Sequence, residues 1–256
     1  MVYLKNILRE TKTRFYQSLA NKRVLIKMER PIISITFDDV PRSVLDNGIP
    51  LLNSHNIKAT FYVAMGLSNT DNKNTDISKS TYLSPDDVLD LHSSGHDIAC
   101  HTYSHYMLNK GTANGLALDA RKNLNALTST LGPIKIDHFS YPFGQVNFKL
   151  KSLLARDYKT MRSSRPGVNF GATDLYLLRA TSIYNPTFNK DVIKACIEKT
   201  ERYGGWLILY THGVENRPDN YSCTPDQLAW VIRQCIKSTA QILPVSEAYT
   251  RIVSNF

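Results

Sequence analysis

Segments that favour strands alternate with segments that favour helices along most of this 256-residue chain. Apolar and β-branched runs predict strands over 32–37, 57–64, 97–100, 136–141, 159–163, 176–183, 206–211 and 241–245. Helical periodicity and start signals predict helices between them, over about 85–91, 114–131, 147–157, 189–203 and 225–239. Such alternation predicts a parallel sheet with helical crossovers, either open or closed into a barrel.

Length and composition favour one large domain. A hydrophobic content of 42% and a charged content of 21% are ordinary for a globular protein. We expect a single domain over residues 31–256, preceded by a distinct segment over residues 1–30. No apolar stretch approaches the roughly 20 residues of a membrane-spanning helix, and basic residues interrupt the apolar positions near the N-terminus. We therefore expect no transmembrane segment, no signal peptide and a cytoplasmic protein.

The N-terminal segment carries most of the net charge. Residues 1–30 contribute +6 of the total of +9. Their apolar residues recur near helical spacing, which predicts a basic amphipathic helix: Leu4, Ile7, Leu8, Phe15 and Leu19. Two interpretations stay open, a helix that packs on the domain and a helix that docks on an anionic membrane at its inner face. Nucleic acid is not an expected partner, because no recognised binding motif accompanies the charge.

Three short motifs bring together the side chains of a metal hydrolase. Asp38 and Asp39 follow an apolar run, where a buried strand ends. His101 and His105 are four residues apart, which brings them to one face if the segment is helical. His212 ends a further strand. Two imidazoles and one carboxylate can hold a divalent ion, and the other two groups are left for proton transfer, although such groups are individually more often structural.

The order of these motifs resembles one known family. Thr36-Phe37-Asp38-Asp39, His101-Thr102-Tyr103-Ser104-His105, Tyr141-Pro142-Phe143-Gly144 and the strand ending at His212 resemble the motifs of polysaccharide deacetylases. These proteins carry the NodB-homology domain and form carbohydrate esterase family four. The similarity covers roughly residues 31–250. It implies a distorted, TIM-like (β/α) barrel of seven or eight strands, with the metal site at the carboxyl ends of the strands.

The resemblance also assigns roles to individual residues. It implies that Asp39, His101 and His105 bind a divalent metal, zinc above all, with cobalt, nickel, manganese and iron as alternatives. Asp38 is then the general base and His212 the general acid. The remaining assignments are an oxyanion contact from the backbone N–H of Phe143 and substrate contacts from Tyr141, Pro142 and Tyr210.

The chain departs from the family pattern at three places. Ser140 stands where many members have an arginine that pairs with the catalytic aspartate. We hypothesise that Arg179 takes over this catalytic role from a neighbouring strand end; the alternative is a solvated or surface-paired arginine. The family's fourth motif is not found, and Tyr210 replaces a residue that is commonly aliphatic.

The function expected from this pattern is removal of an N-acetyl or N-formyl group from an amino sugar. The substrate is expected to be a polysaccharide, or a lipid-linked or nucleotide-linked precursor of a cell-surface glycan. Two alternatives remain. One is an inactive module that binds metal and carbohydrate. The other is a non-haem iron oxygenase, which uses a similar pair of histidines and one carboxylate.

Overall fold

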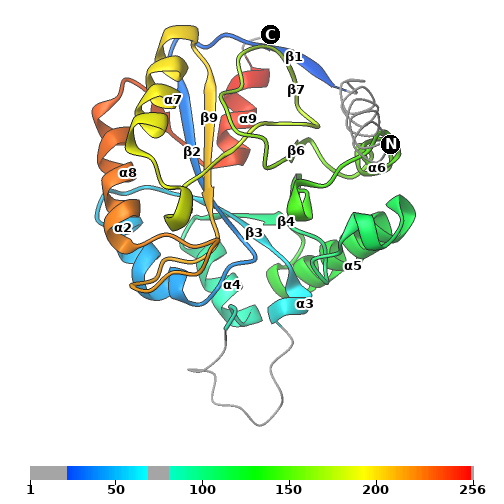
Figure 1. Cartoon of the computed structure of the whole chain (residues 1–256). Helices are drawn as coiled ribbons and strands as arrows, with labels where there is room; N and C mark the ends of the chain where they lie inside the picture. Colours follow the sequence, from blue (N-terminus) through cyan, green and yellow to red (C-terminus); the bar gives the residue numbers. More distant parts are fainter. Residues whose placement is uncertain (1–21, 69–80, 255–256) are drawn as a thin grey trace, which may run out of the picture.

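Figure 1 shows the computed structural model of the chain, which describes residues 22–68 and 81–254. The predicted leader helix lies outside the described residues. Eight parallel strands form the main sheet in the order β6, β5, β4, β3, β2, β9, β8, and β10 pairs with β2. Their bounds are β2 Ile32–Asp38, β3 Thr60–Val63, β4 Asp97–Cys100, β5 His138–Ser140, β6 Thr160–Arg162, β8 Thr181–Ser182, β9 Trp206–Thr211 and β10 Gln241–Ile242.

The two ends of the sheet path meet through a narrow connection. Arg162 at the end of β6 forms an isolated parallel bridge with Leu178, and Ser163 N–H donates to Leu178 O at 2.9 Å. The chain then continues into β8, which pairs with β9. The barrel is distorted here because a single β-bridge replaces a full ladder of hydrogen bonds between strands. The structure therefore confirms the predicted distorted (β/α) barrel.

Helices surround the strands. The predicted helices are present as α4 Pro85–Ser93, α5 Ala113–Leu131, α6 Phe148–Leu154, α7 Lys190–Tyr203 and α8 Pro225–Lys237. In Figure 1, α2, α7 and α8 lie on one side of the strands and α5 lies on the other. Ser84 and Thr224 begin α4 and α8 with capping boxes, in which each side chain accepts a backbone N–H from the third helical residue. No helix within residues 22–68 and 81–254 is long and apolar enough to cross a membrane.

Several elements were not predicted. They are a π-helical turn Val44–Gly48 continued by α2 Ile49–Asn53, then α3 Met65–Ser68 and α9 Val245–Val253. The predicted strand 241–245 ends at Ile242, because Pro244 is the N-cap of α9. The predicted strand 176–183 is reduced to β8, because Asp174 begins a turn: its carboxylate accepts from Tyr176 N–H at 3.0 Å.

A small antiparallel ribbon accompanies the main sheet. β1 Arg23–Ile26 pairs antiparallel with β7 Gly171–Asp174, so this part of the N-terminal segment is a strand packed on the domain. The chain next passes close to Gly204, whose φ of 59° is left-handed. A Cβ atom at Gly204 would lie 2.2 Å from Met28 O, so only glycine fits there.

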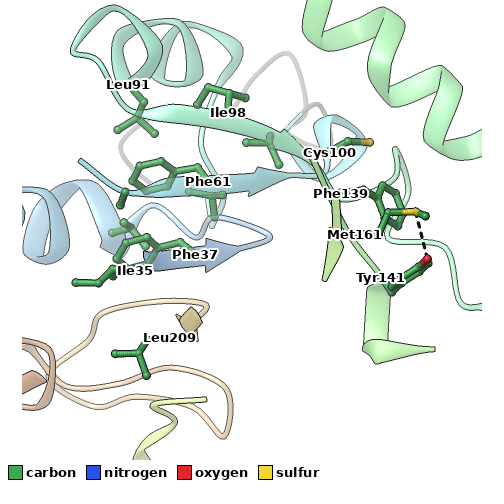
Figure 2. Close-up of a cluster of buried hydrophobic side chains, with 14 of the residues drawn as sticks. Ile35, Phe37, Phe61, Leu91, Ile98, Cys100, Phe139, Tyr141, Met161 and Leu209 are labelled. Atoms are coloured by element: carbon green, nitrogen blue, oxygen red, sulfur yellow. Dashed lines mark hydrogen bonds between the residues drawn. The ribbon is translucent and has the colours of Figure 1, made fainter. Parts of the chain in front are cut away.

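The core fills the space between the strands and the helices. All seven residues of β2 are buried, as expected for a central parallel strand covered on both faces. Figure 2 shows Phe37 and Phe61 stacked across β2 and β3, with ring centroids 5.1 Å apart. Phe139 and Met161 extend the same core toward β5 and β6. This packing holds the carboxyl ends of the strands in fixed positions.

Candidate active site

The carboxyl ends of the strands line one cavity of about 460 Å³. Asp38 is the last residue of β2, and Arg162 is the last residue of β6. His101 directly follows β4, and His212 directly follows β9. Parallel strands end at the same edge of a sheet, so residues far apart in the sequence meet here.

Three side chains in this cavity are arranged to hold a metal ion. The Nε2 atoms of His101 and His105 each lie 3.5 Å from Asp39 Oδ1. Two ligands at about 2.1 Å from a tetrahedral zinc ion lie roughly 3.4 Å apart, so this spacing suits a shared cation. Asp39 Oδ1 is buried and has no hydrogen-bond partner among the described residues. The donor set therefore fits a divalent metal.

The protonation of these groups also suits a cation. Burial lowers the pKa of His101 to about 3 and that of His105 to about 4, so both imidazoles are neutral near pH 7. His101 Nδ1 lies 2.8 Å from Ser140 O, which places the proton on Nδ1 and leaves Nε2 free to bind. Burial and the Asp38 carboxylate raise the pKa of Asp39 to about 8. A bound cation would favour the ionised form of Asp39.

The two histidines converge through a loop, whereas their spacing had suggested a helix. Thr102 and His105 have left-handed φ values of 62° and 51°. Asp119 of α5 holds the loop, because its carboxylate accepts from Tyr103 N–H at 2.8 Å and Ser104 N–H at 2.9 Å. Left-handed backbone at residues other than glycine is strained and gathers at functional sites. The helical reading of the histidine pair is therefore wrong.

Asp38 pairs with Arg162, which was not predicted. The Nη2 atom of Arg162 contacts Asp38 Oδ1, and both side chains are buried. Burial alone would raise the pKa of Asp38, but Arg162 and the nearby histidines lower it below its usual range. Arg179 does not line this cavity: its Nη1 donates to Pro166 O at 3.1 Å beside a different cavity. The hypothesis that Arg179 replaces the missing arginine is therefore wrong.

His212 lies beside the residues arranged to hold the metal. Its Nε2 lies 3.7 Å from Asp39 Oδ2, and its Nδ1 lies 3.2 Å from the backbone oxygen of Tyr221. Burial lowers the pKa of His212, while the Asp38 carboxylate acts in the opposite direction. The Tyr221 carbonyl thus orients the ring in this chain, where the family's fourth motif is not found.

The residues of the Tyr141-Pro142-Phe143-Gly144 motif differ in whether they line the cavity. Phe143 and Tyr141 line the cavity, and Phe143 has a left-handed φ of 56°. The Tyr141 hydroxyl points away, because it donates to Tyr176 O at 3.1 Å. Pro142 is buried and begins the 3₁₀ turn without lining the cavity. Tyr210 lines the cavity with its ring over the Arg162 guanidinium, whose carbon lies 4.6 Å from the ring centroid.

Several further lining residues had no motif to reveal them. Polar and aromatic side chains of this group are Tyr82, Ser164, Tyr184, Asp219 and Tyr221. They come from loops, where sequence alone gives little information about direction. Arg162 had a signal, because it lies near the end of the predicted strand 159–163, at the edge where the motif residues were expected.

Known proteins resemble this chain in sequence. Residues 26–160 match the family model described as polysaccharide deacetylase. A bifunctional xylanase/deacetylase of Pseudobutyrivibrio xylanivorans is 26% identical over 116 residues, which cover 45% of this chain and 17% of that protein. The chain thus matches only a small part of that relative.

Solved structures share the fold. A family 4 acetyl xylan esterase from Clostridium thermocellum, in complex with a cobalt ion, is 18% identical, with a TM-score of 0.60 and coverage of 86% of this chain and 90% of that one. A CE4 family pseudoenzyme from Bacillus anthracis is 11% identical, with a TM-score of 0.60 and coverage of 86% and 66%. The family model matches more than half of the chain, and the chain therefore belongs to the polysaccharide deacetylase family.

Proposed function

We propose that this chain is a divalent-metal hydrolase that releases acetate from an N-acetylated amino sugar of a glycan. One observation carries the proposal: Asp39, His101 and His105 converge beside Asp38 and His212 in a single cavity. A protein that only bound metal would need the first three residues alone. The two additional proton carriers are what amide hydrolysis requires.

The metal would be held by Asp39, His101 and His105, with zinc as the first candidate. When bound, such an ion polarises a carbonyl oxygen and lowers the pKa of water toward neutrality. Asp38 is ionised near pH 7, because Arg162 and the nearby histidines together outweigh the effect of its burial. It can therefore accept the proton of the attacking water.

His212 is placed to complete the reaction. An amine leaves readily only when it is protonated, so the reaction needs a general acid on the side of the departing nitrogen. With the Nδ1–H directed at the Tyr221 carbonyl, Nε2 of His212 faces the cavity, and the imidazole must carry a second proton on Nε2 to act as this acid. The Asp38 carboxylate favours that imidazolium form, and the proton that Asp38 takes from water can replace the one that His212 gives to the amine. The backbone N–H of Phe143 is proposed to donate to the oxyanion, and Tyr210 to contact the acyl group.

Finer parts of the proposal concern the setting of this reaction. The glycan is proposed to belong to a cell surface or to its precursor, and formyl is the alternative acyl group. Residues 31–256 are proposed to act as a single catalytic domain in the cytoplasm. The basic N-terminal segment is proposed to contact an anionic membrane at its inner face, because it carries +6 of the net charge.

The test is an assay of acetate and formate release from N-acetylated and N-formylated amino sugars, with and without added zinc. Asp38→Asn is expected to lower the rate by roughly 10²–10⁴-fold while metal binding remains. The matched control is Asp46→Asn, an exposed aspartate outside the cavity, which should keep the wild-type rate. Metal and sugar binding without release of either acid by the wild type would favour an inactive binding module.

A further inference from the structure

The loop that follows β9 is fastened to the catalytic histidine. The backbone oxygen of Tyr221 accepts hydrogen bonds from His212 N–H at 3.1 Å and from Thr211 Oγ1 at 3.4 Å, besides its contact with His212 Nδ1. Gly213 N–H donates to Ser222 Oγ at 3.1 Å. These bonds hold the backbone at and directly after Tyr221, and so they support its side chain.

The Tyr221 ring is exposed despite this fixed backbone. Its side chain lies at the cavity with 58% of its surface exposed, although the ring contacts Tyr184 and His212 at centroid distances of 5.7 and 5.6 Å. A rigid tyrosine offers a large amphipathic face at little entropic cost. The apolar face of a sugar ring suits such a surface.

Asp219 adds a hydrogen-bonding group beside this ring. It lines the same cavity, and its Oδ1 accepts from Tyr221 N–H at 2.9 Å. Burial alone would raise the pKa of Asp219, but hydrogen bonds from Tyr221 and Ser222 lower it, so the carboxylate is ionised at neutral pH. An ionised carboxylate accepts from hydroxyl and ammonium groups and repels anions.

The cavity wall offers little to a phosphate. Among the lining residues in the described part of the chain, Arg162 is the one lysine or arginine, and it is 1% exposed and paired with Asp38. Within residues 22–68 and 81–254, no free basic side chain therefore lines this wall. Phosphate recognition normally uses accessible arginine or lysine.

We infer that Tyr221 and Asp219 form a subsite for a second sugar, which stacks on the tyrosine and donates hydroxyl or ammonium hydrogen bonds to the aspartate. The inference rests on the proposed deacetylase function and assigns two specificity-determining residues to it. Through Tyr221 and Asp219 the site favours a chain of neutral or amine-bearing sugars over a phosphate-linked monosaccharide.

The first test compares kcat/KM for N-acetylglucosamine, its tetramer and UDP-N-acetylglucosamine. The wild type is expected to favour the tetramer at least tenfold over both others. Tyr221→Ala and Asp219→Asn should each reduce the tetramer-to-monomer ratio at least fivefold, and Tyr221→Phe should retain it. Tyr203→Ala removes an exposed tyrosine of α7 and is the control that keeps the wild-type ratio. An unchanged ratio in Tyr221→Ala, or preference for the nucleotide sugar, would overturn the inference.

A binding measurement separates this inference from the proposed chemistry. Calorimetric titration of the tetramer into Asp38→Asn protein reports sugar binding without turnover. Adding Tyr221→Ala to the Asp38→Asn protein should raise the Kd for the tetramer at least tenfold. If the wild type released no acid while this loss appeared, the hydrolase proposal would fail and the subsite would stand. An unchanged Kd would contradict the subsite, whatever the rate assay showed.

Discussion

The buried ion pair between Asp38 and Arg162 helps to keep Asp38 ionised. Removal of one partner of a buried pair leaves an uncompensated charge, which typically costs about 3–5 kcal/mol. Arg162→Met is expected to lower the free energy of unfolding by this amount and to reduce activity. Arg162→Lys keeps the charge and should lose less stability, as urea unfolding can measure. Equal stability of Arg162→Met and the wild type would contradict the role of the pair.

Ser140 and Arg162 are register partners on β5 and β6, which allows a test of the displaced arginine. Arg162→Ser should lose activity, and adding Ser140→Arg should restore it at least tenfold, because a guanidinium then approaches Asp38 from the position common in the family. Arg179→Ala is the control, since its side chain contacts Pro166 O away from the cavity, and it should keep the wild-type rate. A double variant no more active than Arg162→Ser would contradict this exchange.

Sequence alone was informative about the motif residues and less so about their partners. Asp38, Asp39 and His212 lie at strand ends, which can be predicted from apolar runs. Selection of Arg162 over Arg179 requires the register of β6 and the turn begun by Asp174, which depend on contacts far apart in the sequence. Local sequence patterns do not indicate such contacts.

The loop between β4 and α5 is the element that controls the metal cradle. Asp119 accepts two backbone N–H groups of this loop, and groups that orient metal ligands typically contribute 10–100-fold to affinity. Asp119→Ala is therefore expected to weaken zinc affinity by roughly that factor. Competition with a chromophoric chelator measures it. Asn125→Ala, an exposed change on the same helix, should leave the affinity unaltered.

Elements were predictable where a single local pattern determines them. The long helices α5, α7 and α8 and the strands β2 and β9 have clear periodicity or apolar runs, and they were placed to within a few residues. The β1–β7 ribbon joins residues about 150 apart in the sequence, so neither strand has a local signal for its partner. α9 had an apolar stripe of Val245, Ala248 and Ile252 that could have revealed it.

At the scale of the whole molecule, buried histidines make stability depend on pH. Burial lowers the pKa of His138 to about 4, against about 6.5 in the unfolded chain. The unfolded chain thus takes up the proton first, and the stability contributed by neutral His138 is lost as the pH falls from 6.5 toward 4. Between pH 7 and pH 5, the free energy of unfolding of His138→Asn should fall less than that of the wild type, as chemical unfolding at the two pH values can measure. Equal losses would contradict this origin.

The zinc content of the purified protein is the decisive measurement for the metal site. Wild-type protein loaded with zinc and then dialysed should retain one ion per chain by elemental analysis, and His101→Ala and His105→Ala should each retain far less while remaining folded by circular dichroism. Zinc absent from the wild type, or retained by both variants as fully as by the wild type, would contradict the cradle formed by Asp39, His101 and His105.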